Sequence, residues 1–490
     1  MKNSDELRKF GLKIAEMRMN AHMTQLNLTD SDPPWISTER NSVRINSQAL
    51  YKYMKENTPY RISDRGNIFR YDGKVYCPVS DREFKATIKD MLPVDYRNRR
   101  DWSAVFNEYK TDHPDFSEVE LDADEDLIGF ANGVLKLSTM ELLPYEESFR
   151  LSRIVPCKYQ ADKGLDDAPR FSKFVNDLTN GNQEEISFLM EYIGAAVSNV
   201  SGFRFKKMLI LVGEGNTGKS VLRTLVTRLL GEENCATIDI KRLQERFGTY
   251  QLYLKRLAGS GDMSNLELAD LNVIKELTGG DTVMAEQKGK DGFTFLYRGL
   301  LWFNANALPL FSGDKGAHVY ERFMIVRCDN IIPEEKRDHH LVEKLMLERD
   351  AIVSASIRYL KNAVDRDYRF TESEDMRQER ERYAVSNNSL FLFIEDCCSI
   401  DFEQQIKLKV KRSVFHRIYK KFCQANNLKP EPERSIKYLL ESRYHLEAHK
   451  TDGHYYYPLD LYRDVYDRLD PSYEFTENRG VERPEPEHPI

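Results

Sequence analysis

The sequence contains no long hydrophobic run. Nowhere do about 18 apolar residues follow one another, which is the length that a transmembrane helix needs, so no membrane-spanning segment is expected. The N-terminal Met-Lys-Asn-Ser-Asp-Glu is not followed by an apolar signal core either. We therefore expect a cytoplasmic protein without a membrane partner.

Paired cysteines are also missing. The 7 cysteines are scattered without a C-x-x-C pair, and the vicinal Cys397-Cys398 suits neither zinc nor an ordinary disulfide. The 10 histidines form no cluster with ligand spacing. We expect reduced, mostly buried thiols and no structural metal.

An excess of positive charge is absent too. The 72 Lys and Arg against 79 Asp and Glu give a net charge of −7, which argues against coating of nucleic acid by the whole surface. A local basic channel stays compatible with this sum, because the position of the charges decides binding. With 490 residues, 41% of them hydrophobic, the chain should form about three or four globular units.

One motif matches the phosphate-binding P-loop at every defined position: Gly213, Glu214, Gly215, Asn216, Thr217, Gly218, Lys219 and Ser220. An apolar run at 208–212 precedes it, and a helical pattern at 221–230 follows it. Glycines let successive backbone N–H groups surround a phosphate, and the helix N-terminus faces the same anion. Lys219 is expected to bridge the β- and γ-phosphates and Ser220 to bind Mg²⁺. The predicted cofactors are ATP and Mg²⁺.

Hydrolysis also needs a carboxylate, a polar group for the attacking water and a cation, and the chain offers one candidate for each. Asp262 ends a short apolar segment, Asn306 follows another, and Arg322 precedes a third. We predict that Lys219, Asp262, Asn306 and Arg322 are catalytic and that Asp262 shares Mg²⁺ with Ser220. The alternatives are a turn or helix-capping aspartate, a turn asparagine and a surface arginine in a salt bridge.

These residues carry a family resemblance. The run through Arg256, Asp262, Lys275, Thr278-Gly-Gly-Asp281, Asn306-Ala-Leu-Pro309 and Arg322 resembles superfamily 3 DNA helicases of the phage, plasmid and poxvirus primase–helicase type. Residues 132–137 and 174–197 resemble the collar domain of that group, so the resemblance covers about 120–330. It points to a replication protein of a satellite phage or mobile chromosomal island of Gram-positive bacteria.

The resemblance implies an α/β P-loop motor of the AAA+-like type. In it Asp262 is the Walker B acid, Asn306 is sensor 1, and Arg322 is an arginine finger that acts in the neighbouring subunit's site. A finger acting in trans requires a ring, normally a hexamer. Lys275 is either a second trans-acting cation or an exposed helix lysine. Met263 follows Asp262, so a second acid is missing at the Walker B position.

Two segments are candidates for holding DNA. Residues 282–296 are predicted to form a hairpin whose basic tip, Lys288 and Lys290, contacts phosphates in a central pore; Gly289 stands where relatives often have an aromatic residue. In the C-terminal part, seven Lys or Arg against two acids occur from 401 to 421. Two helices and a hairpin there suggest a winged helix. Its expected DNA contacts are Arg434, Lys437 and Arg443 from the second helix, and Lys450 and His454 from the wing. A solvated turn and a basic structural cap are the alternatives.

The expected layout comprises six segments: an N-terminal helix and linker (1–45), an α+β N-terminal and collar domain (46–200), the ATPase core (201–335), a helical lid or connector (336–398), a winged-helix DNA-binding domain (399–468) and a disordered tail (469–490). The predicted function is an ATP-dependent hexameric helicase for replication initiation. Its partners would be single-stranded, forked and origin DNA, a homo-oligomer and host replication proteins. Two alternatives remain open: an ATP-switched origin-binding scaffold and a combined primase–helicase.

Overall fold

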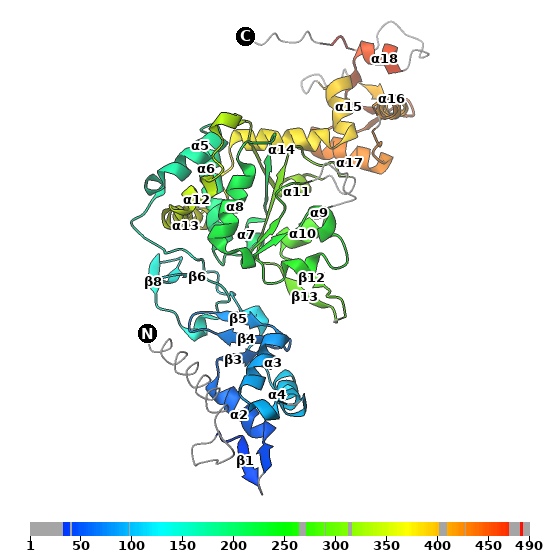
Figure 1. The fold of residues 1–490 in the computed structure, drawn as a ribbon. Helices are drawn as coiled ribbons and strands as arrows, with labels where there is room; N and C mark the ends of the chain where they lie inside the picture. The colour runs from blue at the N-terminus through cyan, green and yellow to red at the C-terminus, as the bar shows by residue number, and fades with distance from the viewer. Residues whose placement is uncertain are drawn as a thin grey trace.

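The computed structural model describes residues 33–39, 42–97, 99–263, 271–289, 291–311, 316–400, 409–426, 428–469 and 481–483. The helix expected near 5–23 lies outside these residues. Within them, an N-terminal unit, a central α/β domain and a C-terminal unit follow one another through space (Figure 1). None of the helices in the described ranges combines the length and apolar character needed to cross a bilayer.

A parallel sheet forms the middle of the central domain. Its five strands lie in the order β10-β11-β14-β9-β15, and every neighbouring pair is parallel. Their bounds are β9 (Met208–Val212), β10 (Cys235–Thr237), β11 (Leu257–Gly259), β14 (Leu300–Ala305) and β15 (Phe323–Arg327). The strands next to the P-loop follow the predicted apolar runs, whereas the short edge strand β10 was not predicted. Because all strands run the same way, the residues that follow β9, β11 and β14 meet at one edge.

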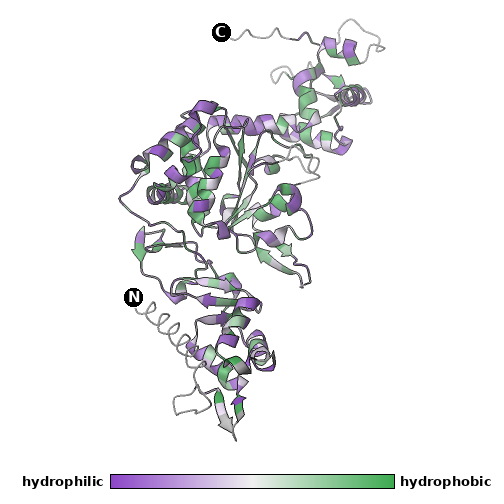
Figure 2. Ribbon diagram, viewed as in Figure 1, coloured by the Kyte–Doolittle hydropathy of each residue, from purple (hydrophilic) through white to green (hydrophobic). Residues whose placement is uncertain are grey.

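Helices cover both faces of this sheet. On one side Leu209 and Leu211 pack with α5 (Pro169–Leu178), α6 (Gln183–Val197), α8 (Lys219–Leu230), α12 (Leu341–Met346) and α13 (Arg349–Asp365). On the other side Ile210 and Val212 pack with α9 (Ile240–Leu243), α10 (Asn272–Gly279), α11 (Ala317–Tyr320) and α14 (Glu374–Ser386). A strand buried on both faces is apolar throughout, which explains the continuous run at β9. Figure 2 shows the hydrophobic strands and the largely hydrophilic α14.

The N-terminal unit is built from short elements around Trp35 and Phe84. They are β1 (Ile36–Glu39), β2 (Ser42–Ile45), α2 (Ser47–Asn57), β3 (Tyr60–Ile62), β4 (Ile68–Tyr71), β5 (Tyr76–Val79), α3 (Asp81–Asp90) and α4 (Arg99–Thr111). The strands β4 and β5 form an antiparallel hairpin around Asp72-Gly73. A second small antiparallel sheet consists of β6 (Leu127–Phe130), β7 (Gly133–Lys136) and β8 (Glu141–Leu143), and it includes residues 133–136 of the segment that resembles the collar domain.

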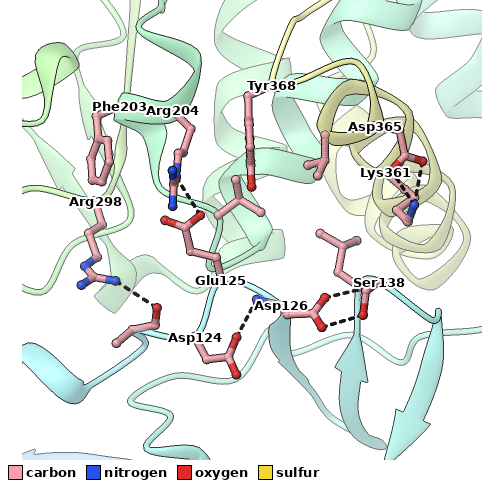
Figure 3. Close-up of a pocket in the computed structure, with 14 residues that line it drawn as sticks. Asp124, Glu125, Asp126, Ser138, Phe203, Arg204, Arg298, Lys361, Asp365 and Tyr368 are labelled. Atoms are coloured by element: carbon pink, nitrogen blue, oxygen red, sulfur yellow. Dashed lines mark hydrogen bonds and ion pairs between the residues drawn. The ribbon is translucent and has the colours of Figure 1, made fainter.

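Arginines fasten the segment 122–126 to the rest of the chain. Arg153 pairs with Asp122 at 2.9 Å, and Arg204 of α7 (Gly202–Phe205) pairs with Glu125 at 3.2 Å. Arg298 donates a hydrogen bond to the Ala123 carbonyl oxygen at 3.2 Å. A hollow of about 650 Å³ opens beside this joint, and Figure 3 shows its charged side chains paired with groups around it. The hollow therefore lies at the junction between the small β6–β8 sheet and the central domain, and we regard it as part of that junction.

The C-terminal unit has its own core. It contains α15 (Ser389–Cys397), β16 (Cys398–Ser399), β17 (Val410–Lys411), α16 (Arg412–Ala425), α17 (Glu433–Tyr444), β18 (His449–Thr451), β19 (His454–Tyr457), β20 (Asp460–Leu461) and α18 (Arg463–Leu469). The apolar side of α15, which the sequence assigned to the connector, is buried in this core with α16. The order of two helices and a β18–β19 hairpin agrees with the predicted elements.

Part of the expected disordered tail is docked on this unit. Val481 exchanges backbone hydrogen bonds with Leu461 and Arg463 at 3.1 Å each. Arg483 pairs with Asp464 at 3.1 Å. For 481–483 the prediction of disorder is therefore corrected, because the edge beside Leu461 offers free backbone partners that a composition argument cannot see. The rest of that tail lies outside the described residues.

Candidate functional site

The P-loop wraps so tightly that two of its glycines are required. Gly213 has φ of +152°, and a Cβ there would lie 2.1 Å from the Cys328 carbonyl oxygen. Gly218 has φ of +97°, and its Cβ would lie 3.0 Å from the Phe174 ring. Both conformations are open to glycine and strained for other residues. The loop is thus packed between Cys328, which directly follows β15, and α5, and α8 begins at Lys219 directly behind it.

The Lys219 ammonium is held inside this loop by neutral oxygens. It donates to the carbonyl oxygens of Gly213 and Glu214 at 2.6 Å each and to Thr217 Oγ1 at 3.1 Å. Burial lowers the pKa of Lys219, while the nearby Cys328 and Asp262 act in the opposite direction. A cation whose bonded partners are uncharged is well prepared to exchange them for an anionic ligand.

Three of the four predicted catalytic residues line one cavity. It measures about 360 Å³, and its wall combines 215–221 with Gly261, Asp262, Ala305 and Asn306. Lys219, Ser220, Asp262 and Asn306 thus face one space, as expected from the meeting of strand ends. The cationic lysine, the hydroxyl, the carboxylate and the helix N-terminus fit a magnesium-bound triphosphate.

The structure distinguishes the two asparagines of the Asn304-Ala-Asn306 run. Asn304 is 1% exposed, and its side-chain oxygen accepts a hydrogen bond from Trp302 Nε1 at 3.0 Å. Its backbone oxygen accepts from Met263 N at 2.8 Å, which aligns the segment that carries Asp262. Asn304 is therefore an internal support, and Asn306 is the amide that lines the cavity.

Sequence reasoning missed one buried residue that braces the site. Arg223 of α8 donates to the Trp302 carbonyl oxygen at 2.8 Å and to the Gly259 carbonyl oxygen at 2.7 Å. It therefore ties the P-loop helix to the strands that carry Asn306 and Asp262. A basic residue on a helix that must be buried against a sheet is the signal that points to such a brace.

Arg322 lies at the opposite edge of the sheet. It directly precedes Phe323, which pairs with Met208 at the start of β9. Five residue steps lead from Met208 to Gly213, and Arg322 lies one step before the Met208 level, which together corresponds to about 20 Å at about 3.3 Å per residue. An arginine side chain cannot span this distance, so Arg322 is not part of its own subunit's nucleotide cavity.

The hairpin predicted at 282–296 is confirmed as β12 (Thr282–Ala285) paired with β13 (Phe293–Leu296). Lys288 is exposed at its tip, and Lys290 lies outside the described residues. The predicted site residues leave out an Arg246-Phe247 pair beside the hairpin. Arg246 Nε pairs with Glu286 Oε2 at 2.6 Å, and the Phe247 ring is 45% exposed. An arginine followed directly by an aromatic residue is the sequence pattern that would have pointed to this pair.

The predicted DNA contacts of the C-terminal unit differ in exposure and in the groups that they contact. Arg434 is exposed on α17, whereas Lys437 pairs with Glu441 at 3.7 Å. The Arg443 guanidinium lies 4.8 Å from the centre of the Phe391 ring. On the wing, the Lys450 ammonium lies 5.9 Å from the centre of the Tyr455 ring, and His454 is exposed. Arg443 thus contributes to packing as well as to surface charge.

A basic groove of about 590 Å³ lies between α16 and the wing. It is lined by Lys411, Arg412, Ser413, His416, Arg417, Lys420, Glu433, Gly453, His454 and Tyr455. Glu433 pairs with His416 at 3.4 Å and with Lys420 at 3.5 Å. The sequence showed this basic run, but the predicted contacts were assigned to α17 and the wing. The groove adds α16 to the charged surface.

Comparisons with known proteins agree with parts of this picture. Residues 47–180 match a family model described as D5 N terminal like, and residues 385–456 match one described as Poxvirus D5 protein-like. Residues 211–322, which include the P-loop, match a family of unknown function, DUF5906. A protein of Invertebrate iridescent virus 3 named "Putative helicase 121R" is 29% identical over 211 residues, which are 40% of this chain and 22% of that relative. These matches support a D5-like helicase family.

Among solved structures, two similar chains are the A form apo structures of the NrS-1 C terminal region. They are 12% and 11% identical to this chain, with TM-scores of 0.45 and 0.46. Each alignment covers 83% of this chain and 98% of the other. The chain spans about a fifth of the length of the viral relative.

Proposed function

We propose that this chain is an ATP-dependent DNA helicase of the superfamily 3 type that acts in replication initiation as a ring, normally a hexamer. The relation between Arg322 and the nucleotide cavity carries the proposal. Among the described residues, the cavity at one edge of the sheet is lined by Lys219, Ser220, Asp262 and Asn306 and by no arginine, and the other edge holds Arg322. A head-to-tail ring brings unlike edges of neighbouring subunits together and would complete the site.

In that site each residue has a defined task. Lys219 would bind the β- and γ-phosphates, and Ser220 and Asp262 would hold Mg²⁺, which neutralises charge on the phosphates when bound. Asn306 would orient the attacking water. Arg322 of the neighbouring subunit would stabilise the negative charge that develops during phosphoryl transfer. The lining of the cavity by the first four residues supports these roles.

We further infer that single-stranded DNA is held by the β12–β13 hairpin. Lys288 and Lys290 would contact phosphates without regard to sequence, which suits a translocating motor. Phe247, exposed beside the hairpin and flanked by Arg246, would supply the aromatic surface that Gly289 cannot. The Arg246–Glu286 ion pair supports this grouping, because it links the loop to the hairpin.

The C-terminal unit would act as a winged-helix domain for origin and forked DNA. Arg434, Lys437, Arg443 and Lys450 remain the proposed contacts, and the basic groove on α16 widens the surface. Duplex DNA is attracted by such a surface even when the whole protein is acidic. A source in a satellite phage or mobile chromosomal island, and a handover to host replication proteins, belong to the same proposal.

Unwinding of a forked DNA substrate tests this function. Lys219→Ala should abolish ATP hydrolysis and unwinding, while alanine at the exposed Lys336 should change neither. Arg322→Ala should bind ATP normally and lose at least about 100-fold in turnover, as expected for an arginine finger. Hydrolysis that never separates strands, with ATP-dependent assembly intact, would favour the scaffold alternative. Primer synthesis by the chain would favour the primase–helicase.

A further inference from the structure

The Arg322 side chain is bound within its own subunit by the segment Thr278–Asp281. Its Nη1 donates to Thr278 Oγ1 at 2.7 Å, and the Thr278 hydroxyl donates in turn to the Ile274 carbonyl oxygen at 2.6 Å. Asp281 provides the favourable charge, although burial lowers the pKa of Arg322. Among the described residues Arg322 Nε is buried without a hydrogen-bond partner. The Arg322 Nη1 group is therefore bound by Thr278, whereas the Nε group has no acceptor among these residues.

This segment has little freedom to move by itself. Gly280 has φ of +84°, and a Cβ there would lie 3.1 Å from the Phe203 ring. Asp281 N donates to the Glu276 carbonyl oxygen at 3.1 Å, which closes the end of α10. The backbone of Arg322 is fixed as well, because its carbonyl oxygen accepts from Met208 N at 2.8 Å. Only the Arg322 side chain can adjust, and Thr278 defines where it points.

The same segment leads directly into the hairpin. Asp281 is followed by Thr282, which is the first residue of β12 and pairs with Leu296 of β13. The residues that hold the Arg322 guanidinium thus lie directly before the hairpin that is proposed to bind DNA.

We propose that Thr278 is a positioning residue for Arg322, and that the Thr278–Asp281 segment holds the guanidinium in place for the nucleotide site of the neighbouring subunit. This inference rests on the proposed function, in which Arg322 acts in trans. Thr278 orients the guanidinium, and Asp281 holds its charge near the subunit surface until a neighbour's phosphates compete for it.

The first test compares Thr278→Val with Thr278→Ser in the full chain. Valine keeps the shape but removes the hydroxyl, so ATP turnover at saturation should fall at least about 10-fold, as for loss of a hydrogen bond to a charged group. The KM for ATP should stay unchanged, because the variant's own cavity is intact. Serine restores the hydroxyl and should restore turnover. A rise in KM with unchanged turnover would overturn the inference.

The second test mixes variants in one ring. A Thr278→Val subunit keeps a complete nucleotide cavity, and a Lys219→Ala subunit keeps a correctly held Arg322. In an equal mixture, one interface in four combines the intact cavity of a Thr278→Val subunit with the correctly held Arg322 of a Lys219→Ala subunit. Turnover should therefore recover to about a quarter of wild type if unlike edges meet around the ring. If the mixture shows no gain over the average of the two variants, Thr278 acts within its own subunit and the inference is wrong.

A control mixture separates this inference from the proposed function. Arg322→Ala mixed with Lys219→Ala should also recover turnover if the arginine acts in trans. Recovery in this control without recovery for Thr278→Val overturns only the positioning role. Failure of both mixtures overturns the trans arrangement itself. If Thr278→Val does not fold, Thr278→Ala replaces it; alanine also removes the hydroxyl that accepts from Arg322 Nη1, without adding bulk, and the same recovery is expected.

Discussion

Arg322 and Lys219 lie at opposite edges of the same parallel sheet. Arg322 immediately precedes the pairing of Phe323 with Met208, and Lys219 opens the helix that follows the other end of β9. The two cations therefore cannot serve one nucleotide within one subunit. This separation gives the proposed ring a physical reason, since a neighbouring subunit can bring the two edges together.

Two glycines of the P-loop should respond very differently to the same substitution. In Gly213→Ala the new methyl would lie 2.1 Å from the Cys328 carbonyl oxygen, in a strained backbone region. In Gly215→Ala it would meet nothing within 4 Å. We expect Gly213→Ala to lower the melting temperature by several degrees and to abolish ATP binding, while Gly215→Ala keeps the fold. Thermal unfolding and nucleotide titration measure both effects; equal melting temperatures would contradict the assignment.

Alanine substitutions at Asn304 in β14 and at Asn306 directly after it should separate an effect on catalysis from an effect on stability. Asn306→Ala removes an amide from the cavity, so turnover should fall about 10-fold or more while stability stays near wild type. Asn304→Ala leaves the buried Trp302 Nε1 without its acceptor and should cost about 1–3 kcal/mol of unfolding free energy. Denaturant unfolding and steady-state ATPase assays distinguish the pair. A stable, inactive Asn304→Ala would reverse the two roles.

The hairpin and its neighbouring loop should control DNA-dependent activity alone. Lys288→Ala should weaken single-stranded DNA binding and reduce its salt slope by about one. Phe247→Ala should cost about 1–3 kcal/mol of binding if a base stacks on the ring. Basal ATPase without DNA should stay unchanged in both, because neither residue lines the nucleotide cavity. Leu347→Ala, at an exposed apolar residue on another surface, is the matched control and should not affect binding.

Glu185 should make stability depend on pH. Burial raises the pKa of this carboxyl from 4.5 to about 7, although Ser373 donates a hydrogen bond to it at 3.3 Å. Because the folded state binds the proton more tightly, this contribution is complete below about pH 4.5 and is lost as pH rises through about 7. Unfolding free energies of wild type and Glu185→Gln, measured between pH 5 and 8, should diverge in favour of the variant. Parallel curves would contradict the raised pKa.

Much of the site was accessible to sequence reasoning because local patterns encode it. The P-loop residues occupy fixed positions between a strand and a helix, and Asp262 and Asn306 each follow an apolar strand. Because parallel strands all end at the same edge of a sheet, the residues that follow them are predicted to lie close together. The same reasoning could not separate Asn304 from Asn306, because which side chain turns inward depends on the Trp302 contact. It also missed Arg223, whose partners come from two other strands.

The phosphate-binding loop, the strands that carry Asp262 and Asn306, and the β12–β13 hairpin could be predicted from the amino-acid sequence, because each depends on residues close together in the chain. Tertiary structure alone decided how individual side chains are oriented and how far apart they lie. It turned Asn304 toward Trp302 and Asn306 toward the cavity, placed Arg322 about 20 Å from the level of Gly213, and set its guanidinium against Thr278. The physical reason is that strand order and register, which fix these distances, arise from packing between distant segments and leave no periodic mark in the sequence.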